Sequence, residues 1–354
     1  MRQFHPRSVA FQVADFLKEE LRQGTWEHEI PGIVTLATKL GVNHKTVETA
    51  LKQLEQEGLL ETQGPGRPRR ITLFNRRKLI SSLRIGILLF DQTSLNLSYL
   101  SKIRYSLENE GHEIVLSPKT MCSLKHDPLK IAKMAKQCLV DCWIIPSANR
   151  EILKWFATQD QPAFALAGRF RNLPIPAIAP DKVPAMREAL KKMVANNHQR
   201  IVLLTRRSRR SPKPGRFERL FLKELENHRI TPSKFHLPDW DEDATGFHSG
   251  LESLFQLTPP TAIIADESEF IGGILQFCTQ KGLAVPRDLS LLSSDPDPSF
   301  TWFHPQISHI HWSTQPIIRR IVRWIHNVSI GVEDIRQSSS KATFIEGGTI
   351  GPVK

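Results

Sequence analysis

Two short amphipathic patterns with a turn between them mark the N-terminal part of the chain. The first contains three apolar residues at helical spacing, Leu36, Ala37 and Leu40. In the second, apolar residues recur with helical spacing from Val47 to Leu54, which indicates one buried face of an α-helix. Gly41 offers a turn position where a positive φ costs little, and Asn43 is a good N-cap. The pattern predicts a helix-turn-helix, with an ordinary amphipathic helical hairpin as the alternative.

The segments on either side extend this pair of helices. Upstream, a third amphipathic pattern closed by Gly24 predicts another helix, whose apolar positions are Val9, Val13, Phe16, Leu17 and Leu21. Downstream, Gly58 ends the second helix of the pair, and two short strands at 59–62 and 67–73 flank the turn Gly64-Pro65-Gly66. This order predicts a winged helix-turn-helix.

The outer surface of this predicted domain is rich in groups that bind DNA. The exposed start of the second helix offers hydrogen-bonding side chains to bases or phosphates, and the wing is strongly basic. Gly66-Arg67-Pro68 resembles the core of an AT-hook, and an extended Arg-Pro segment is narrow enough to enter a minor groove. A solvated basic turn that contacts only phosphates is the alternative. The candidate DNA-binding residues are Thr35, Asn43, His44, Lys45, Thr46, Arg67, Arg69 and Arg70.

The stretch Val42–Leu60, VNHKTVETALKQLEQEGLL, closely follows the pattern of the GntR family of bacterial regulators. The resemblance covers about residues 8–73 and implies a winged-helix DNA-binding domain. The family often has Arg at the positions of Val34, His44 and Glu48, where those arginines help to read its usual operator. The resemblance therefore implies the fold of the domain but not an operator sequence.

Size and charge agree with a DNA-binding protein of more than one domain. The chain has 354 residues, a formal charge of +12 and a pI of about 9.7, which favours polyanionic partners and is too long for a single winged helix. The run from Gly64 to Ser82 holds six basic residues and no acidic one. We interpret residues 74–82 as a linker, and proximity to DNA or simple solvation would explain its charge.

Several classes of protein are disfavoured by the sequence. No apolar run reaches the ~18 residues of a membrane span, and the N-terminus has no apolar leader. Four cysteines without a CxxC pair indicate buried thiols in a reducing cytoplasm, and we expect neither a metal nor a cofactor. The sequence contains no Gly-rich phosphate loop, nucleophile elbow or HExxH motif, so we do not expect an enzyme.

From Leu83 onward the pattern changes to strand, helix, strand. Near-continuous apolar strands separated by helices indicate parallel sheets covered on both faces, and their number is sufficient for two sheets. The expected strands are 83–90, 113–116, 142–145, 163–167, 201–205, 261–265, 289–292 and 307–312. Helices are expected at 99–110, 184–196 and 217–228, among others. The fold class is α/β, and a two-lobed version places its ligand site in the cleft between lobes.

This second part resembles the LacI/GalR effector domain, a relative of periplasmic sugar-binding proteins. The resemblance covers about residues 83–352. It rests on the first strand, Leu83–Leu89, on the stretch Pro259–Glu267, and most specifically on Gly282–Ser290. A GntR-type head on a LacI-type body is the architecture of AraR-like sugar regulators. We therefore expect a DNA-binding domain at 1–73, a linker at 74–82, and a type I periplasmic-binding-protein-like effector and dimerisation domain at 83–354.

The resemblance implies a set of effector-binding positions. Asp295 matches the family's ligand-binding Asp, and Asp266 stands where the family has Asn or Ser. The family's sugar-binding Arg aligns with Phe217, and the adjacent Arg216 is its expected substitute. Trp240 lies in a loop where some members place a ring against the sugar. The full set is Phe90, Asp91, Ser147, Arg216, Trp240, Asp266 and Asp295.

Each of these positions has a structural alternative. Asp295 could cap a helix or turn, Trp240 could cover the core, and Ser147 could be an N-cap. A basic cluster at 206–219 borders the expected cleft. It would attract an anionic effector such as a phosphorylated or acidic sugar, or it is a solvated loop.

Together these features predict a cytoplasmic DNA-binding transcriptional regulator. We expect it to be a repressor that binds double-stranded operator DNA as a homodimer, under the control of a small polar effector, a carbohydrate. The alternative is a DNA-binding protein whose effector domain no longer binds a ligand, which the residues at Asp266 and Phe217 keep open.

Overall fold

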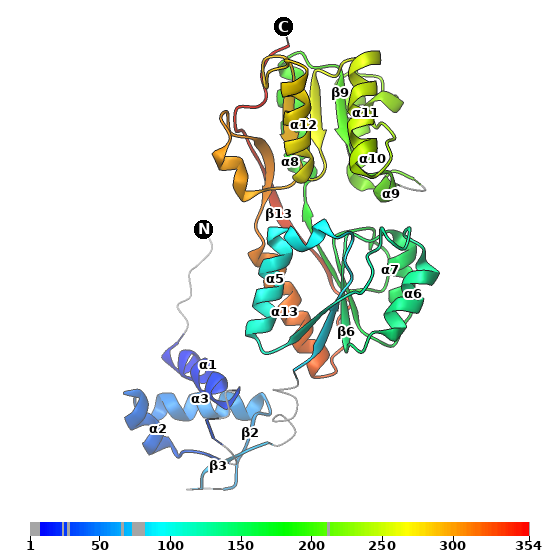
Figure 1. The fold of residues 1–354 in the computed structure, drawn as a ribbon. Helices are drawn as coiled ribbons and strands as arrows, with labels where there is room; N and C mark the ends of the chain where they lie inside the picture. Colours follow the sequence, from blue (N-terminus) through cyan, green and yellow to red (C-terminus); the bar gives the residue numbers. More distant parts are fainter. Residues whose placement is uncertain are drawn as a thin grey trace. The chain divides into compact units, whose positions relative to one another are not determined.

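The chain is described by a computed structural model over residues 8–22, 25–26, 29–64, 67–72, 82–210 and 213–353. It divides into two compact units, residues 1–82 with 326–332, and residues 83–325 with 333–354. Here the first is called the head and the second the body (Figure 1). Within the described residues, no helix is long and apolar enough to cross a membrane.

The head combines three helices with a small antiparallel sheet. The helices are α1 (Val9–Arg22), α2 (Ile33–Leu40) and α3 (His44–Gln56), and the sheet has the order β1 (Glu29–Ile30), β3 (Arg69–Ile71) and β2 (Leu60–Glu61). Strands β2 and β3 form the predicted wing and are shorter than expected. Strand β1 was not predicted, because two residues are too few to make a pattern. Gly24, Pro65, Gly66, Leu73 and positions 74–81 of the expected linker lie outside the described residues.

The core of the head confirms most of the predicted apolar stripes. Val47, Ala50, Leu51 and Leu54 of α3 are fully buried against Leu17 of α1. Gly41 has the expected positive φ of 65° at the end of α2. The expectation for α1 was wrong at Val9 and Phe16, which are 56% and 48% exposed. The buried face of α1 is narrower than expected. Val13, Leu17 and Leu21, which lie one turn apart, and Ala14 already fill the contact with the rest of the head core.

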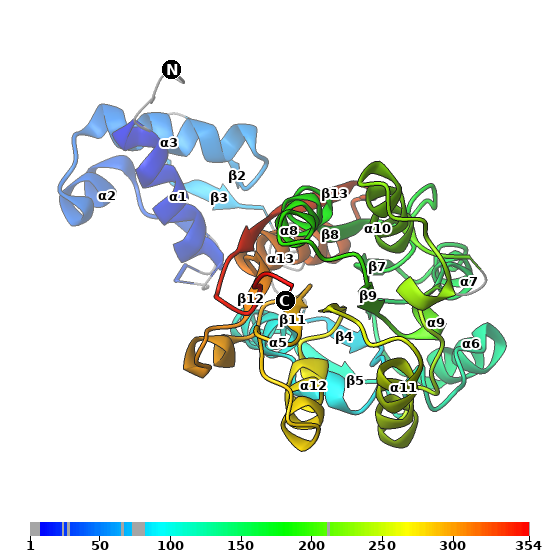
Figure 2. The same ribbon diagram turned by 90° about the horizontal axis from the view of Figure 1, so that it is seen from above.

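The body consists of two lobes, each a parallel sheet with helices on both faces (Figures 1 and 2). The strands of the first lobe are β4 (Arg84–Ile87), β5 (Glu113–Leu116), β6 (Cys142–Pro146), β7 (Ala163–Leu166) and β8 (Ala177–Asp181). Those of the second are β9 (Ile201–Leu204), β10 (Ala262–Ala265), β11 (Ser290–Ser293) and β12 (Ser308–Trp312). The overall order is β5-β4-β6-β7-β8-β13-β12-β11-β10-β9. The eight predicted strands are thus all present.

Helices cover the sheets of both lobes. The first lobe carries α5 (Ser98–Asn109), α6 (Pro128–Gln137), α7 (Arg150–Phe156) and the part of α13 (Gln315–Ser329) up to residue 325. The second carries α8 (Val183–Ala195), α9 (Arg207–Arg210), α10 (Arg216–Asn227), α11 (Ala244–Leu257) and α12 (Glu269–Gln280). Short 3-10 helices are η1 (Thr93–Asn96), η2 (Lys234–His236) and η3 (Pro298–Trp302). Trp143 is buried in the hydrophobic core of the first lobe. Its indole can lie against β4 only because Gly86 has no side chain, since a Cβ at that position would come within 2.6 Å of the indole.

Strand β13 (Gln337–Ile345) joins the two sheets. Its first residues, 337–341, pair parallel with β8, and its last, 342–345, pair antiparallel with β12. Neither β8 nor β13 was predicted, because β8 contains Pro180 and β13 begins with the polar run Gln-Ser-Ser-Ser. The expectation of two parallel sheets is corrected in one respect, since the sheets are continuous through an antiparallel pair.

Candidate nucleic-acid interface and effector cleft

The start of α3 presents polar side chains to solvent. The Asn43 side chain accepts a hydrogen bond from the Thr46 backbone N–H at 2.7 Å, which confirms its N-cap role and fixes where the helix begins. Asn43, His44 and Lys45 are exposed, while Thr46 is partly buried. Thr35 on α2 is also exposed. The opposite face of α3 is buried, so this polar end is the part of the helix that faces solvent.

The three predicted wing arginines differ in their surroundings. The Arg69 side chain forms an ion pair with Glu55 of α3, and both are largely buried. Arg67 and Arg70 are exposed. Arg69 therefore holds the wing against α3, and the other two arginines carry the exposed positive charge of the wing.

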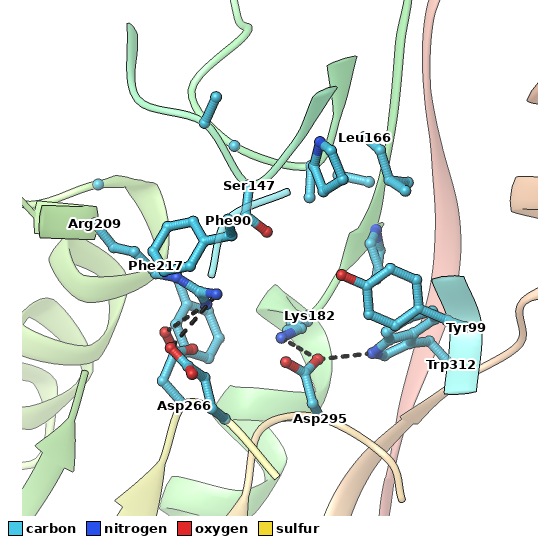
Figure 3. A pocket seen from close by; sticks show the side chains of 18 of the residues that line it. Phe90, Tyr99, Ser147, Leu166, Lys182, Arg209, Phe217, Asp266, Asp295 and Trp312 are labelled. Carbon is cyan, nitrogen blue, oxygen red and sulfur yellow. Dashed lines mark hydrogen bonds and ion pairs between the residues drawn. The ribbon is translucent and has the colours of Figure 1, made fainter. Parts of the chain in front are cut away.

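A cavity of about 780 Å³ lies between the two lobes of the body (Figure 3). Its walls come from the segments that follow the carboxyl ends of the parallel strands. Six of the seven predicted effector residues line it, namely Phe90, Asp91, Ser147, Arg216, Asp266 and Asp295. Ser147 has a positive φ of 52° and is not an N-cap, since Asn149 caps α7. The structure thus brings together residues that are far apart in sequence.

Trp240 is the predicted residue that does not line this cavity. Trp240 is 9% exposed, and its ring packs edge-on against Phe247 and Phe270, with ring centroids 5.6 and 5.5 Å away. Its indole N–H donates to the Thr205 carbonyl oxygen at 3.1 Å. Trp240 therefore belongs to the core of the second lobe, as in the alternative interpretation.

At one side of the cavity Asp295 is held by groups that the sequence analysis did not single out. Lys182 lies 2.5 Å from Asp295 Oδ1, and the Trp312 indole N–H donates to the same oxygen at 3.0 Å (Figure 3). The ring of Tyr99 stands 5.6 Å from that of Trp312. Burial raises the pKa of Tyr99, so its phenol remains a neutral hydrogen-bond donor. No sequence signal marked Lys182, because it follows the unpredicted strand β8.

Asp266 is buried among hydrogen-bond donors of its own lobe. It accepts from Thr205 Oγ1 at 3.0 Å and Ser294 Oγ at 3.1 Å, and Arg209 lies 3.4 Å away. Burial alone would raise the pKa of Asp266, but the charges of Arg209 and Lys182 together with the hydrogen bonds hold it below its usual value. Asp266 is therefore an ionised group with part of its bonding capacity already used by the protein.

Arg206 links the two lobes across the cleft. It makes hydrogen bonds of 2.8 to 3.1 Å with both carboxylate oxygens of Glu267 in the second lobe, and it lies 3.2 Å from Asp91 of the first lobe. Its guanidinium also stands over the rings of Phe90 and Phe270, at 5.5 and 5.6 Å. This part of the basic cluster is therefore not a solvated loop, because its arginines are partnered by the protein.

Two family models match separate parts of the chain. Residues 10–67 match the family described as bacterial regulatory proteins, gntR family. Residues 190–350 match the periplasmic binding protein-like domain. The chain joins a GntR-type head to a periplasmic-binding-protein-like body. A curated relative, the HTH-type transcriptional repressor PurR of Edwardsiella ictaluri, is 29% identical over 120 residues. That match spans 34% of this chain and only 35% of the relative.

Solved structures share the fold at low identity. A LacI family regulator from Enterococcus faecium with bound ribose has a TM-score of 0.60 at 16% identity, over 77% of this chain and 100% of that chain. One from Mycobacterium smegmatis has a TM-score of 0.61 at 14% identity, over 76% and 100%. The lac repressor dimer bound to operator and an anti-inducer has a TM-score of 0.58 at 19% identity, over 77% and 95%.

Proposed function

We propose that this protein is a transcriptional repressor whose DNA binding is controlled by a small polar effector. The observation that carries the proposal is the presence in one chain of two features. The head exposes the polar N-terminal end of α3, whose opposite face is buried. The body has a cavity of about 780 Å³ between its two lobes. The named relatives are regulators, and the curated one is a repressor.

The lining of the cavity favours a carbohydrate as the effector. Carboxylate oxygens such as those of Asp295 accept hydrogen bonds from hydroxyl groups, and the rings of Tyr99, Trp312 and Phe217 offer apolar faces to a sugar ring. Pockets with mostly apolar walls and a few convergent polar groups are typical small-molecule sites. The regulator with bound ribose shares this fold.

We propose further that the active form is a homodimer. Two winged heads related by a two-fold axis match the two half-sites of a pseudo-palindromic operator. Closure of the cleft would then change the spacing of the heads and so the affinity for DNA. By linkage, an effector that weakens DNA binding is itself bound less tightly by the DNA complex, typically by about 1–3 kcal/mol.

The test of DNA binding is a gel shift with an operator selected by the protein from a random pool. Lys45→Ala should weaken binding and lower the slope of log affinity against log salt by about one for each lost phosphate contact. Lys133→Ala on α6, an exposed lysine of the body, is the control and should behave as wild type. Wild-type affinity and slope in Lys45→Ala would contradict the assignment of α3 as the DNA-reading helix.

A second candidate is a DNA-binding protein whose body no longer binds a ligand. It is favoured by two ion pairs within the protein, Arg209 with Asp266 and Lys182 with Asp295, which use the carboxylates that would otherwise bind a ligand. Thermal unfolding with a library of sugars and sugar acids separates the two candidates. A stabilising compound whose effect is lost in Asp295→Asn supports effector control, whereas a library without any effect supports the second candidate.

A further inference from the structure

The solvent-facing side of α3 carries a carboxylate close to the N-terminal end of the helix. Glu48 lies one turn after His44, and its side chain is 44% exposed. It is the one acidic residue among the first eight of α3, all of which the structure describes. Lys45 and Lys52 are exposed and lie three and four residues away, which places them on the same face. The surface that is proposed above to bind DNA therefore combines basic side chains with a carboxylate.

The two acidic residues of α3 have different surroundings. Glu55 is paired with Arg69, both side chains are largely buried, and the pair joins the wing to the helix. Glu48 is paired with Lys52 at 2.9 Å, and these two side chains are 44% and 62% exposed. An exposed pair four residues apart on a helix contributes little to stability. The hydrogen bond and charge of Lys52 hold the pKa of Glu48 below its usual value, so its carboxylate is ionised at neutral pH.

An ionised carboxylate on a DNA-binding face is repelled by the phosphates, unless it meets a hydrogen-bond donor on the edge of a base. In the major groove, guanine presents two acceptors and thymine presents one. Adenine presents its N6 donor beside the N7 acceptor, whereas cytosine presents the N4 donor without an acceptor of its own. Cytosine is therefore the base whose major-groove edge best suits the carboxylate of Glu48.

We propose that Glu48 is a specificity-determining residue that accepts a hydrogen bond from the N4 amino group of a cytosine in the operator. This proposal rests on the proposed function of the head and names one base that the head recognises. The same carboxylate disfavours DNA without cytosine at that place, because it then faces acceptors and phosphates. Glu48 thus separates operator from other DNA by attraction to one and repulsion from the other.

The first experiment compares the operators that wild type and Glu48→Ala select from a random DNA pool. Alanine is the best helix former and keeps α3 intact. The wild-type operator should contain a position where cytosine is preferred, and Glu48→Ala should show no preference there. The affinity of Glu48→Ala for the wild-type operator should fall by about 5- to 150-fold. Its affinity for DNA without an operator should rise, because one negative charge is removed from the binding face.

The second experiment places N4-methylcytosine at that position of the operator, so that a methyl group replaces the N–H that is not used in base pairing. Wild type should bind this operator more weakly, whereas Glu48→Ala should not distinguish it from the unmodified one. Lys52→Ala removes the same ion pair from its other side and should weaken binding to all sequences while it keeps the preference for cytosine. Glu108→Ala is the matched control. It removes an equally exposed pair with Arg104, four residues apart on α5 of the body, and should behave as wild type.

The outcomes separate this inference from the proposed function. A Glu48→Ala protein that selects the same sequence with wild-type affinity overturns the inference, as does an N4-methyl group without effect at every cytosine of the operator. The same loss of preference in Lys52→Ala assigns the effect to the ion pair and also overturns it. Operator binding that depends on Lys45 but not on Glu48 retains the proposed function and rejects the cytosine contact alone. A wild type that selects no sequence rejects both.

Discussion

The pair between Arg206 and Asp91 should hold the two lobes together before any ligand binds, and Asp91→Asn isolates it. Asp91 Oδ1 accepts from Thr93 Oγ1 and from both the backbone N–H and the hydroxyl of Ser94, whereas Oδ2 faces Arg206. An Asn keeps the first oxygen and the local turn. It replaces the second oxygen with an N–H donor, which cannot pair with a guanidinium.

The expected cost follows from the burial of the pair and from what Arg206 retains. The side chains of Arg206 and Asp91 are 13% and 19% exposed, so the pair is worth more than a surface ion pair of about 0–1 kcal/mol. It costs less than a fully orphaned buried charge, about 3–5 kcal/mol, because Arg206 keeps its bonds to Glu267. We expect a loss of about 1–2 kcal/mol and a fall in Tm of about 2–8 °C.

The effect should depend on pH in a defined direction. Burial opposes ionisation of Asp91, but hydrogen bonds from Ser94 and Thr93 and the charge of Arg206 hold its pKa below the usual value. A lowered pKa in the folded state gives stability that is complete above the unfolded-state pKa of about 3.9 and is lost as the pH falls through the folded-state pKa. The difference between wild type and Asp91→Asn should be constant near neutral pH and shrink below about pH 4.

The measurement combines thermal unfolding with hydrogen exchange followed by mass spectrometry. In Asp91→Asn, amides of residues 91–97 and 205–210 should exchange faster, because the contact between the lobes is lost. The control is Asp239→Asn, which removes an ion pair of 2.8 Å with Arg210 inside the second lobe. Equal changes in the two variants, or unchanged exchange in Asp91→Asn, would refute a contact that holds the lobes together.

Three further predictions concern the effector, the wing and the assembly. With an effector that stabilises wild type, tryptophan emission should change through Trp312, which lines the cavity, and Trp240→Phe should keep that change; its loss would place Trp240 at the ligand. Glu55→Gln should weaken operator binding, because Arg69 then no longer holds the wing to α3; an unchanged gel shift would argue against that support. Residues 83–354 should run as a dimer in light scattering, and a monomer there beside a dimeric full chain would place the interface elsewhere.

The helices of the head could be predicted because each buries one continuous stripe. Val47, Ala50, Leu51 and Leu54 are fully buried on the expected spacing. The caps at Gly41 and Asn43 follow from backbone requirements that few residues meet. Val9 and Phe16 have the right spacing but remain exposed. A periodic pattern states which residues share a face, and it does not state how wide the neighbouring surface is.

In the cleft, the sequence located the ends of strands but not the directions of side chains. Asp266 and Asp295 follow apolar strands and could be placed at one edge of a sheet. Trp240 lies in a loop, where nothing local indicates that its ring turns into the core. Lys182 and Trp312 lie where the chain passes from one lobe to the other. They reach the site only because the pairing of β8 with β13 connects the two sheets. Such residues depend on topology, which single-strand patterns do not contain.

The position of β13 has a consequence for the synthesis of the chain. This strand is synthesised after every other strand that the structure describes, yet it lies in the middle of the ten-stranded order, between β8 and β12. Until residues 337–345 emerge, each lobe has an open edge whose N–H and C=O groups lack a partner strand, and such edges are sites of aggregation. Deletion of residues 337–354 should therefore yield insoluble protein, although it removes fewer residues than one lobe contains.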